Sequence, residues 1–196
     1  MGRELICGYG MPLEKNNVDT DQIIPARFCY VPKRHGHENS LFGDWREKKD
    51  FVINNPIYKK ATILVAGYGF ATGSSREYAV WAIKDYGFNV VIAQSFGEIF
   101  YKNAIINDLL PVKTSSEATQ TLWGILKKCP EEVIHIDLYD ELIKVGKQSF
   151  PIFIESGVKN KYLLNQDDIS LTMEELDKIL LYESKRYPLS LIHISE

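Results

Sequence analysis

The chain has 196 residues, of which 45% are hydrophobic and 25% are charged, so it is long enough to fold around a core as one domain. Lys and Arg number 23 against 26 Asp and Glu, and the net charge of -3 provides no field that attracts nucleic acid. The longest uncharged apolar run, residues 61–71, falls short of the roughly 20 residues that a membrane-spanning helix needs. We therefore expect no nucleic acid and no membrane as partners.

The N-terminus and the cysteines bear on the compartment and on metal chemistry. Residues 1–10 (MGRELICGYG) lack the sustained apolar region of a secretory signal, so the expected compartment is the cytoplasm. Cys7, Cys29 and Cys129 are widely spaced and match neither a disulfide framework nor a CxxC metal motif. The chain alone is therefore expected to hold no iron–sulfur cluster and no structural zinc.

The first elements in chain order are a strand and an acidic turn. Residues 3–13 read as a strand interrupted by two glycines. Residues 17–22 (NVDTDQ) form an acidic turn that lacks the Gly and Glu positions of a calcium-binding EF-hand. We expect an Asx-type turn here that starts a second strand at Ile23.

A long polar segment, residues 29–54, follows. It contains prolines, glycines and the basic cluster Lys33-Arg34-His35, and loops of this length in compact domains are usually functional or mobile. We expect it to be a lid whose second half is anchored by apolar residues near Phe42. His35 and His37 are expected to be solvated and are assigned no role.

The middle of the chain predicts two strand–turn–helix units. Residues 61–66 (ATILVA) and 89–93 (NVVIA) are short β-branched runs typical of buried parallel strands. Ser74 to Glu77 and Ser95 to Glu98 each match the capping-box pattern of a helix start. Helices are expected to follow to Gly87 and to about residue 106, which implies parallel strands with crossover helices.

The last part of the chain predicts mixed elements. We expect a helix near 117–129, a β-hairpin over 133–144, a strand at 150–154 and a final helix over 172–183. The fold class is therefore α/β with a mixed sheet. We expect residues 1–188 to form a single domain and residues 189–196 (LSLIHISE) to be a tail outside it.

The turn from Gly67 to Glu77 carries the clearest chemical signal. A glycine-rich turn that ends at a helix N-terminus directs unpaired N–H groups at a carboxylate or phosphate, and Arg76 adds a planar fork for two-point carboxylate binding. The spacing matches neither a Walker loop nor GxGxxG. In the alternative, structural interpretation, Ser74 caps the helix, Glu77 completes the box and Arg76 is a solvated charge. Because glycines, two hydroxyls and an arginine converge here, an anion site is at least as good an interpretation.

Three segments resemble the small-subunit family of 3-isopropylmalate dehydratases, which are aconitase-type isomerases of leucine biosynthesis. They are Asn17–Phe28 (NVDTDQIIPARF), Gly67–Ile83 (GYGFATGSSREYAVWAI) and Asp85–Val112 (DYGFNVVIAQSFGEIFYKNAIINDLLPV). The loop 33–46, with LFGDWR, is similar to the longer bacterial version. The resemblance is specific over about 18–111 and continues weakly to about 186.

This resemblance implies a swivelling β/β/α domain that closes over a separate large subunit. The family's large subunit carries a [4Fe–4S] cluster whose iron acts as a Lewis acid on the departing hydroxyl, so no cofactor is expected in this chain. The reaction moves a hydroxyl between adjacent carbons of a malate-type diacid by dehydration and rehydration through an alkene. The implied partners are the large subunit, in a heterodimer, and the diacid.

The resemblance also assigns roles to individual residues. Ser74 corresponds to the serine that takes the carbon-bound proton, and Ser75 and Arg76 would hold a substrate carboxylate. Asp21 is placed in the site as an acidic side chain. Arg34, or a residue near it, is placed at the distal end of the substrate.

Some positions depart from the family pattern. Gly69 stands where Asn is common, Tyr78 where His is usual and Asp108 where Gly is usual. Homoaconitase-type and citraconate or malate hydratase subunits remain open, because one methylene of the diacid is worth only about 1–3 kcal/mol of discrimination. A non-catalytic anion-binding relative, marked by Tyr78, is the alternative from another class.

Overall fold

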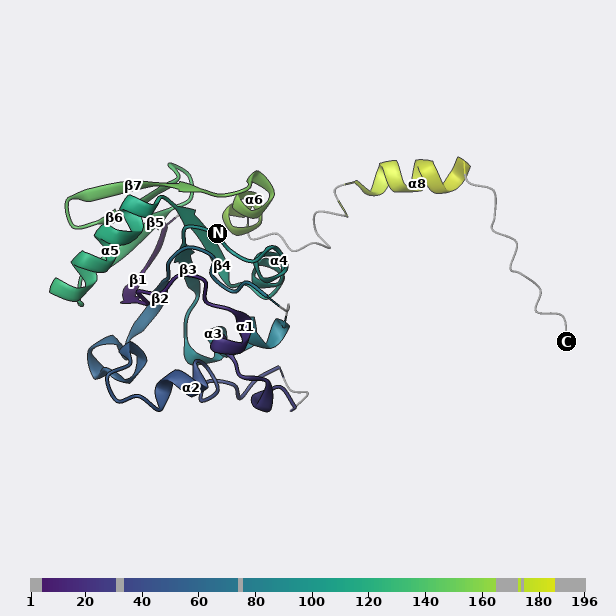
Figure 1. Ribbon diagram of the computed structural model, residues 1–196. Helices are drawn as coiled ribbons and strands as arrows, with labels where there is room; N and C mark the ends of the chain where they lie inside the picture. Colours follow the sequence, from purple (N-terminus) through teal and green to yellow (C-terminus); the bar gives the residue numbers. More distant parts are fainter. Residues whose placement is uncertain (1–4, 31–33, 74–75, 165–172, 174, 186–196) are drawn as a thin grey trace, which may run out of the picture.

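Seven strands form one closed, mixed sheet in the order β1-β2-β3-β4-β7-β6-β5 (Figure 1). The computed structural model describes residues 5–30, 34–73, 76–164, 173 and 175–185. The strands are β1 (Leu5–Pro12), β2 (Ala61–Val65), β3 (Val90–Ala93), β4 (Leu110–Thr114), β5 (Val133–Asp137), β6 (Leu142–Val145) and β7 (Gln148–Phe153).

One half of the sheet is parallel. β1, β2, β3 and β4 pair in parallel, with α3 (Glu77–Tyr86) connecting β2 to β3 and α4 (Glu98–Ile106) connecting β3 to β4. Gly87, at a φ of 115°, ends α3 in the left-handed conformation that glycine adopts without steric cost. The two predicted strand–turn–helix units are thus confirmed.

β4 was not predicted, because Pro111 stands inside it. Leu110 donates its N–H to Asn89, on the β3 side, so the nitrogen of the next residue points toward β7. β7 pairs only with Lys113 and Thr114, further along the strand. The missing N–H of Pro111 therefore removes no ladder hydrogen bond.

The other half of the sheet is antiparallel. β5 and β6 form the predicted hairpin, β7 pairs with β6, and β1 pairs antiparallel with β5. This last pairing closes the sheet into a barrel, whereas the sequence predicted only a mixed sheet. α5 (Ser116–Lys128) contacts β1 and β2, and α6 (Ser156–Leu164), which was not predicted, adds Val158 to the apolar cluster inside the barrel.

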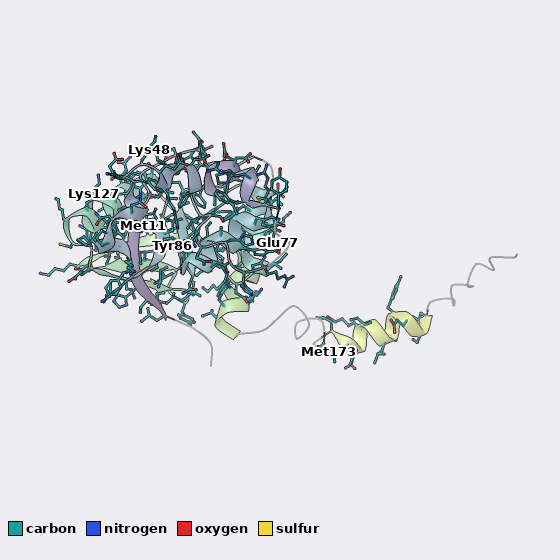
Figure 2. The ribbon with its side chains drawn as sticks, turned by 90° about the horizontal axis from the view of Figure 1, so that it is seen from below. Met11, Lys48, Glu77, Tyr86, Lys127 and Met173 are labelled. Carbon is teal, nitrogen blue, oxygen red and sulfur yellow. The ribbon has the colours of Figure 1, made fainter. Side chains whose placement is uncertain are left out.

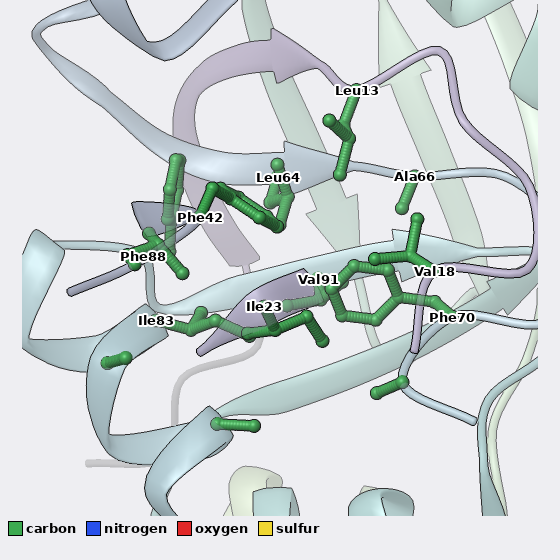
Figure 3. Packing of buried hydrophobic residues seen from close by; sticks show 14 of the residues in the cluster. Leu13, Val18, Ile23, Phe42, Leu64, Ala66, Phe70, Ile83, Phe88 and Val91 are labelled. Carbon is green, nitrogen blue, oxygen red and sulfur yellow. The ribbon is translucent and has the colours of Figure 1, made fainter. Parts of the chain in front are cut away.

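Two apolar cores lie on opposite faces of the parallel strands. Alternate residues of a strand point to opposite faces, so Leu64 and Val91 join one cluster, and Ile63 and Val90 join the other. The first cluster, drawn in Figure 3, packs the sheet against α3, Phe70 and the long segment before β2. The second fills the barrel against α5.

Short helices interrupt the long segment between β1 and β2. They are α1 (Thr20–Ile23), η1 (Ala26–Phe28), α2 (Gly43–Arg46), η2 (Val52–Asn54) and η3 (Pro56–Tyr58). Leu41 and Phe42 are fully buried and Trp45 stacks on Phe42 with ring centroids 5.4 Å apart, so the expected anchoring of the second half is confirmed.

The last described helix of the chain, α8 (Leu176–Lys185), lies apart from the barrel (Figure 1). Met173, just before this helix, also lies apart from the barrel (Figure 2). The helix α8 buries none of its residues. The predicted final helix began at residue 172, which lies outside the described residues, as does the tail 189–196. None of the helices in the described part of the chain is long and apolar enough to cross a lipid bilayer.

Candidate active site

The chain continues past the carboxyl ends of β1, β2 and β3 as three extended segments lying side by side. Gly67 donates to Lys15 O at 3.1 Å, and Asp19 pairs with Thr72 in a parallel bridge. On the other side, Gly97 donates to Phe70 O at 2.9 Å. The middle of these three segments, which follows the carboxyl end of β2, is the predicted glycine-rich turn.

The described part of the turn, residues 67–73 and 76–77, contains three residues with positive φ. Gly69 and Gly73 have φ values of 66° and 92°, and the non-glycine Ala71 has a φ of 58°. Asn and Gly are the residues that tolerate this conformation best, which explains why glycine can replace the family's usual Asn at position 69. Ala71 is buried in a strained conformation, and such strain gathers at ligand sites.

Gly97 allows the neighbouring segment to approach this turn. A Cβ at position 97 would lie 2.2 Å from the carbonyl oxygen of Ala71, which is backbone and cannot rotate away. Gly97 is also the N-cap of α4. Only glycine at position 97 therefore permits the backbone contact with Ala71, which holds the glycine-rich turn against the start of α4.

The acidic turn begins a helix instead of the expected strand. Asp19 Oδ1 accepts the N–H of Gln22 at 2.8 Å, and Gln22 Oε1 accepts the N–H of Asp19 at 3.1 Å. This reciprocal capping box starts α1, so the expected strand at Ile23 is wrong. Because Asp19 is used as a cap, Asp21 is the carboxylate left in the first turn of α1.

Arg76 and Asp21 meet at the amino end of α3. Arg76 Nη1 lies 2.6 Å from Asp21 Oδ1, and Nη2 lies 3.4 Å from Oδ2. The Arg76 side chain is 26% exposed and that of Asp21 is 56% exposed, so the pair stands at the protein surface. The structure thus brings two of the predicted site residues together, and the guanidinium already binds a carboxylate through two bonds.

The predicted capping box at Ser95 does not form, and the one at Ser74 falls on a residue outside the described part of the chain. α3 begins at Glu77 with Arg76 as its N-cap, and no side chain of the described residues caps it. Ser95 Oγ accepts the N–H of Gly69 at 2.9 Å, and the N-cap of α4 is Gly97. The prediction at Ser95 failed because its hydroxyl is hydrogen-bonded to the neighbouring turn.

Asn107, at the end of α4, holds α3 in place. Its Nδ2 donates to Glu77 Oε1 at 2.9 Å, and its Oδ1 accepts the indole N–H of Trp81 at 3.2 Å. Glu77, which directly follows Arg76, is therefore fixed to the neighbouring helix. Sequence reasoning missed this role of Asn107, since no local pattern pairs it with Glu77. The next residue, Asp108, has a φ of 54°, which explains why glycine is usual there.

The long loop docks along α3. Asp85 Oδ2 accepts the N–H of His37 at 2.9 Å, and Asp85 Oδ1 lies 3.3 Å from His35 Nδ1. The His37 ring is 3% exposed, stacks on Trp81 and meets the edge of Tyr78 at a centroid distance of 5.4 Å. The expectation that His37 is solvated is therefore wrong, because α3 covers it. Sequence alone offered no signal for this contact.

Arg34 is exposed and makes no ion pair within the described part of the chain. Its neighbour His35 contacts Asp85, which lies nine residues after Arg76 and so roughly 13 Å further along the helix axis. Glu77 and Tyr86, at the two ends of α3, are labelled in Figure 2. The structure therefore joins Asp21 to Arg76 and leaves Arg34 near the far end of α3.

Ser74 and Ser75 lie outside the described residues. In the chain they stand between Gly73 and Arg76, so they belong to the junction that leads from the turn into α3.

A cavity of about 380 Å³ opens elsewhere, between the end of β1 and residues 45–52. Lys48 and Lys127, both labelled in Figure 2, line it. None of the predicted site residues in the described ranges lines this cavity. The Asp21–Arg76 pair is thus a surface feature at the end of the sheet.

The described residues contain no group of three His, Cys, Asp or Glu side chains placed to hold a metal ion. Cys7 lies on β1, Cys29 follows η1 and Cys129 ends α5, and all three are free thiols. These cysteines stand on separate elements and do not match the spacing of an iron–sulfur cluster motif.

Comparisons with known proteins show which proteins this chain is similar to. The aconitase C-terminal domain family matches residues 6–117. The chain is 43% identical over 181 residues to the 3-isopropylmalate dehydratase small subunit of Corynebacterium kroppenstedtii, covering 92% of this chain and 93% of that protein. The corresponding protein of Mycobacterium avium is also 43% identical, covering 92% of this chain and 91% of its own length.

A solved structure is similar over nearly the whole fold. The crystal structure of 3-isopropylmalate dehydratase from Methanocaldococcus jannaschii matches with a TM-score of 0.63 and 27% identity. The match covers 92% of this chain and 98% of that one.

Proposed function

The chain belongs to the aconitase C-terminal domain family as a 3-isopropylmalate dehydratase small subunit, a hydro-lyase component of leucine biosynthesis, and from this premise we propose which of its residues act. Asp21, Ser74, Ser75 and Arg76 form this chain's half of the active site. Residues 1–188 are one swivelling domain, with the tail 189–196 outside it. Arg34 is assigned to the distal end of the substrate.

The contact between Arg76 and Asp21 is the observation that carries the proposal. In this contact the guanidinium binds a carboxylate through both terminal nitrogens at the amino end of α3. A substrate carboxylate presents the same two oxygens, and the positive end of the helix dipole at the start of α3 favours a second negative charge nearby. A guanidinium has five N–H donors, so Asp21 orients Arg76 by accepting from Nη1 and Nη2, while the remaining donors and Ser75 hold one carboxylate of the diacid.

Ser74 takes the carbon-bound proton. A serine hydroxyl is a very weak acid, so Ser74 can take this proton only as the alkoxide, and that oxyanion must be stabilised by its surroundings before the transfer. The positive end of the α3 dipole and the guanidinium of Arg76 stand next to Ser74 in the chain and supply that stabilisation. When water adds back to the alkene, the proton returns to the carbon that carried the hydroxyl in the substrate.

The partner is the large subunit, which carries the [4Fe–4S] cluster, and the two chains form a heterodimer in the cytoplasm. Support comes from the small-subunit name of the relatives and from the three separated cysteines of this chain. The purified chain is accordingly expected to be colourless and inactive alone.

Anaerobic co-expression of the chain with its large subunit tests the function. The assay follows the ultraviolet absorbance of the alkene diacid, with malates that carry an isopropyl, methyl or carboxyethyl branch as substrates. We expect turnover only when both subunits are present, and fastest with the isopropyl branch. Preference for another branch would identify a related hydro-lyase. A pair that copurifies yet converts no diacid would identify a non-catalytic relative.

A further inference from the structure

Cys7 and His135 form a hydrogen-bonded pair on the outer face of the barrel. Cys7 Sγ lies 3.0 Å from His135 Nδ1. β1 and β5 are antiparallel with Cys7 directly opposite His135, and opposed residues of such a pair project from the same face of the sheet. Cys7 is exposed to solvent, and His135 is partly exposed. An incoming molecule can therefore reach the sulfur.

The pair is separate from the candidate active site. Cys7 lies in the amino-terminal half of β1, five residues before Pro12, which places it roughly 17 Å from the carboxyl end of that strand. The glycine-rich turn of the candidate active site lies beyond the carboxyl ends of the parallel strands. A role for Cys7 is therefore additional to the proposed reaction.

Neighbouring charges leave the imidazole free to act on the thiol. Lys144 lies opposite His135 on β6, but its ammonium pairs with Asp137 Oδ2 at 3.0 Å and with Asp140 Oδ2 at 3.6 Å. Asp137, two residues along β5, is thus engaged by Lys144. Within the described residues no carboxylate pairs with His135, and Cys7 is the side chain at hydrogen-bond distance from its Nδ1.

We propose that Cys7 is a reactive thiol that exchanges with low-molecular-weight disulfides, with His135 as its general base. His135 Nδ1 accepts the thiol proton while Sγ attacks one sulfur of the disulfide. The disulfide's own S–S bond breaks, and the departing thiolate takes the proton from the imidazolium. The products are a mixed disulfide on Cys7 and one free thiol, so atoms and electrons balance without another reagent.

The chain contains its own reference thiol for this proposal. Cys129 is exposed at the end of α5, and Cys29 is partly buried with Sγ 4.0 Å from Pro25 O. Neither sulfur contacts a histidine among the described residues. Cys129 therefore shows how fast an exposed thiol of this protein reacts without a base.

The test incubates the full chain with oxidised glutathione and follows each site by peptide mass spectrometry. We expect Cys7 to form the mixed disulfide at least about tenfold faster than Cys129, because the thiolate is the attacking species. His135→Gln keeps a polar side chain on β5, and we expect it to slow Cys7 to the rate of Cys129 without changing Cys129 itself.

Equal rates at Cys7 and Cys129 in the unmodified chain would overturn the proposal without requiring any variant to fold. A Cys7 rate unchanged by His135→Gln would also overturn it, since the base would then be irrelevant. Cys7→Ser supplies the blank, in which only Cys129 and Cys29 gain mass.

Discussion

Arg76 and Asp21 connect α3 to α1 by a two-point contact, with Nη1 2.6 Å from Oδ1 and Nη2 3.4 Å from Oδ2. The two residues are 55 positions apart in the chain and come from the segments that follow β1 and β2. The same fork that binds Asp21 is the group proposed to bind the substrate carboxylate. Its geometry, and not its charge alone, is therefore expected to matter.

Arg76→Lys tests this point. We expect kcat/KM of the reconstituted enzyme to fall about tenfold or more, because one ammonium cannot make two parallel hydrogen bonds to a carboxylate. The control is Arg27→Lys, since Arg27 also pairs with a carboxylate, Asp44, but at an exposed position outside the site. Equal kcat/KM values for Arg76→Lys and Arg27→Lys would show that Arg76 is an ordinary surface residue without a role in substrate binding.

Gly97→Ala tests the close approach of the two segments beside α4. The added Cβ would lie 2.2 Å from Ala71 O, so the turn must shift, and we expect the free energy of unfolding to fall by about 1–3 kcal/mol. Gly124→Ala is the matched control, because nothing lies within 4 Å of a Cβ there. In the middle of α5 this change should stabilise by about 0.5–1 kcal/mol. Urea unfolding measures both, and an unaffected Gly97→Ala variant would contradict the stated packing.

Asp85→Ala tests whether the loop depends on its anchor. Asp85 accepts from the backbone of His37 and contacts the ring of His35, so its removal frees residues 35–40 from the end of α3. We expect faster hydrogen exchange over these residues, with the anchored stretch near Phe42 unchanged because it is held by the core. The lid prediction adds that partner and substrate slow this exchange in the unmodified chain. Exchange rates over residues 35–40 that stay the same after Asp85→Ala would contradict the role of the anchor. Rates that stay the same when partner and substrate are added would contradict the lid prediction.

Asp137 makes part of the stability depend on pH. The N–H of Asp140, the ammonium of Lys144 and the N–H of Tyr139 bind this carboxylate and hold its pKa below the usual value of 3.8. A folded pKa below the unfolded one means that this stability is fully present above about pH 4 and is lost as the pH falls through the folded pKa.

We therefore expect Asp137→Asn to be less stable than the unmodified chain at pH 7, with the gap narrowing below pH 3.8. Urea midpoints across this range measure the gap. Asp50→Asn, a change at an exposed carboxylate, should show neither effect. A gap at residue 137 that stays constant with pH would show that the carboxylate charge is not involved.

Local pattern predicted β1, β2, β3 and the helices α3 and α4 of the parallel half, but neither β4 nor the closure of the sheet. The β-branched runs at β2 and β3 are buried on both faces, and Gly87 ends α3 by its own conformational freedom. Pairing of β1 with β5 joins segments about 130 residues apart and depends on the three-dimensional path of the chain. No periodicity within either strand specifies that partner.

The site was predictable where residues act through their chemical type. Arg76 and Asp21 were both selected from sequence, and they do meet. The capping box predicted at Ser95 failed because the Ser95 hydroxyl has its hydrogen-bond partner in a distant segment, at Gly69. Capping competes with every other partner that the fold brings near, and sequence spacing does not show those partners.

Turnover by the Ser74→Ala variant of the reconstituted heterodimer tests most directly the claim that this chain supplies the proton acceptor. At saturating isopropylmalate we expect the rate of alkene formation to fall about 100-fold or more, because a general base contributes that much. Assembly with the large subunit and KM should change little, since Arg76 still holds the carboxylate. Ser149→Ala, on the exposed strand β7, is the control and should keep its rate. A Ser74→Ala heterodimer that forms alkene at the unmodified rate would contradict the account.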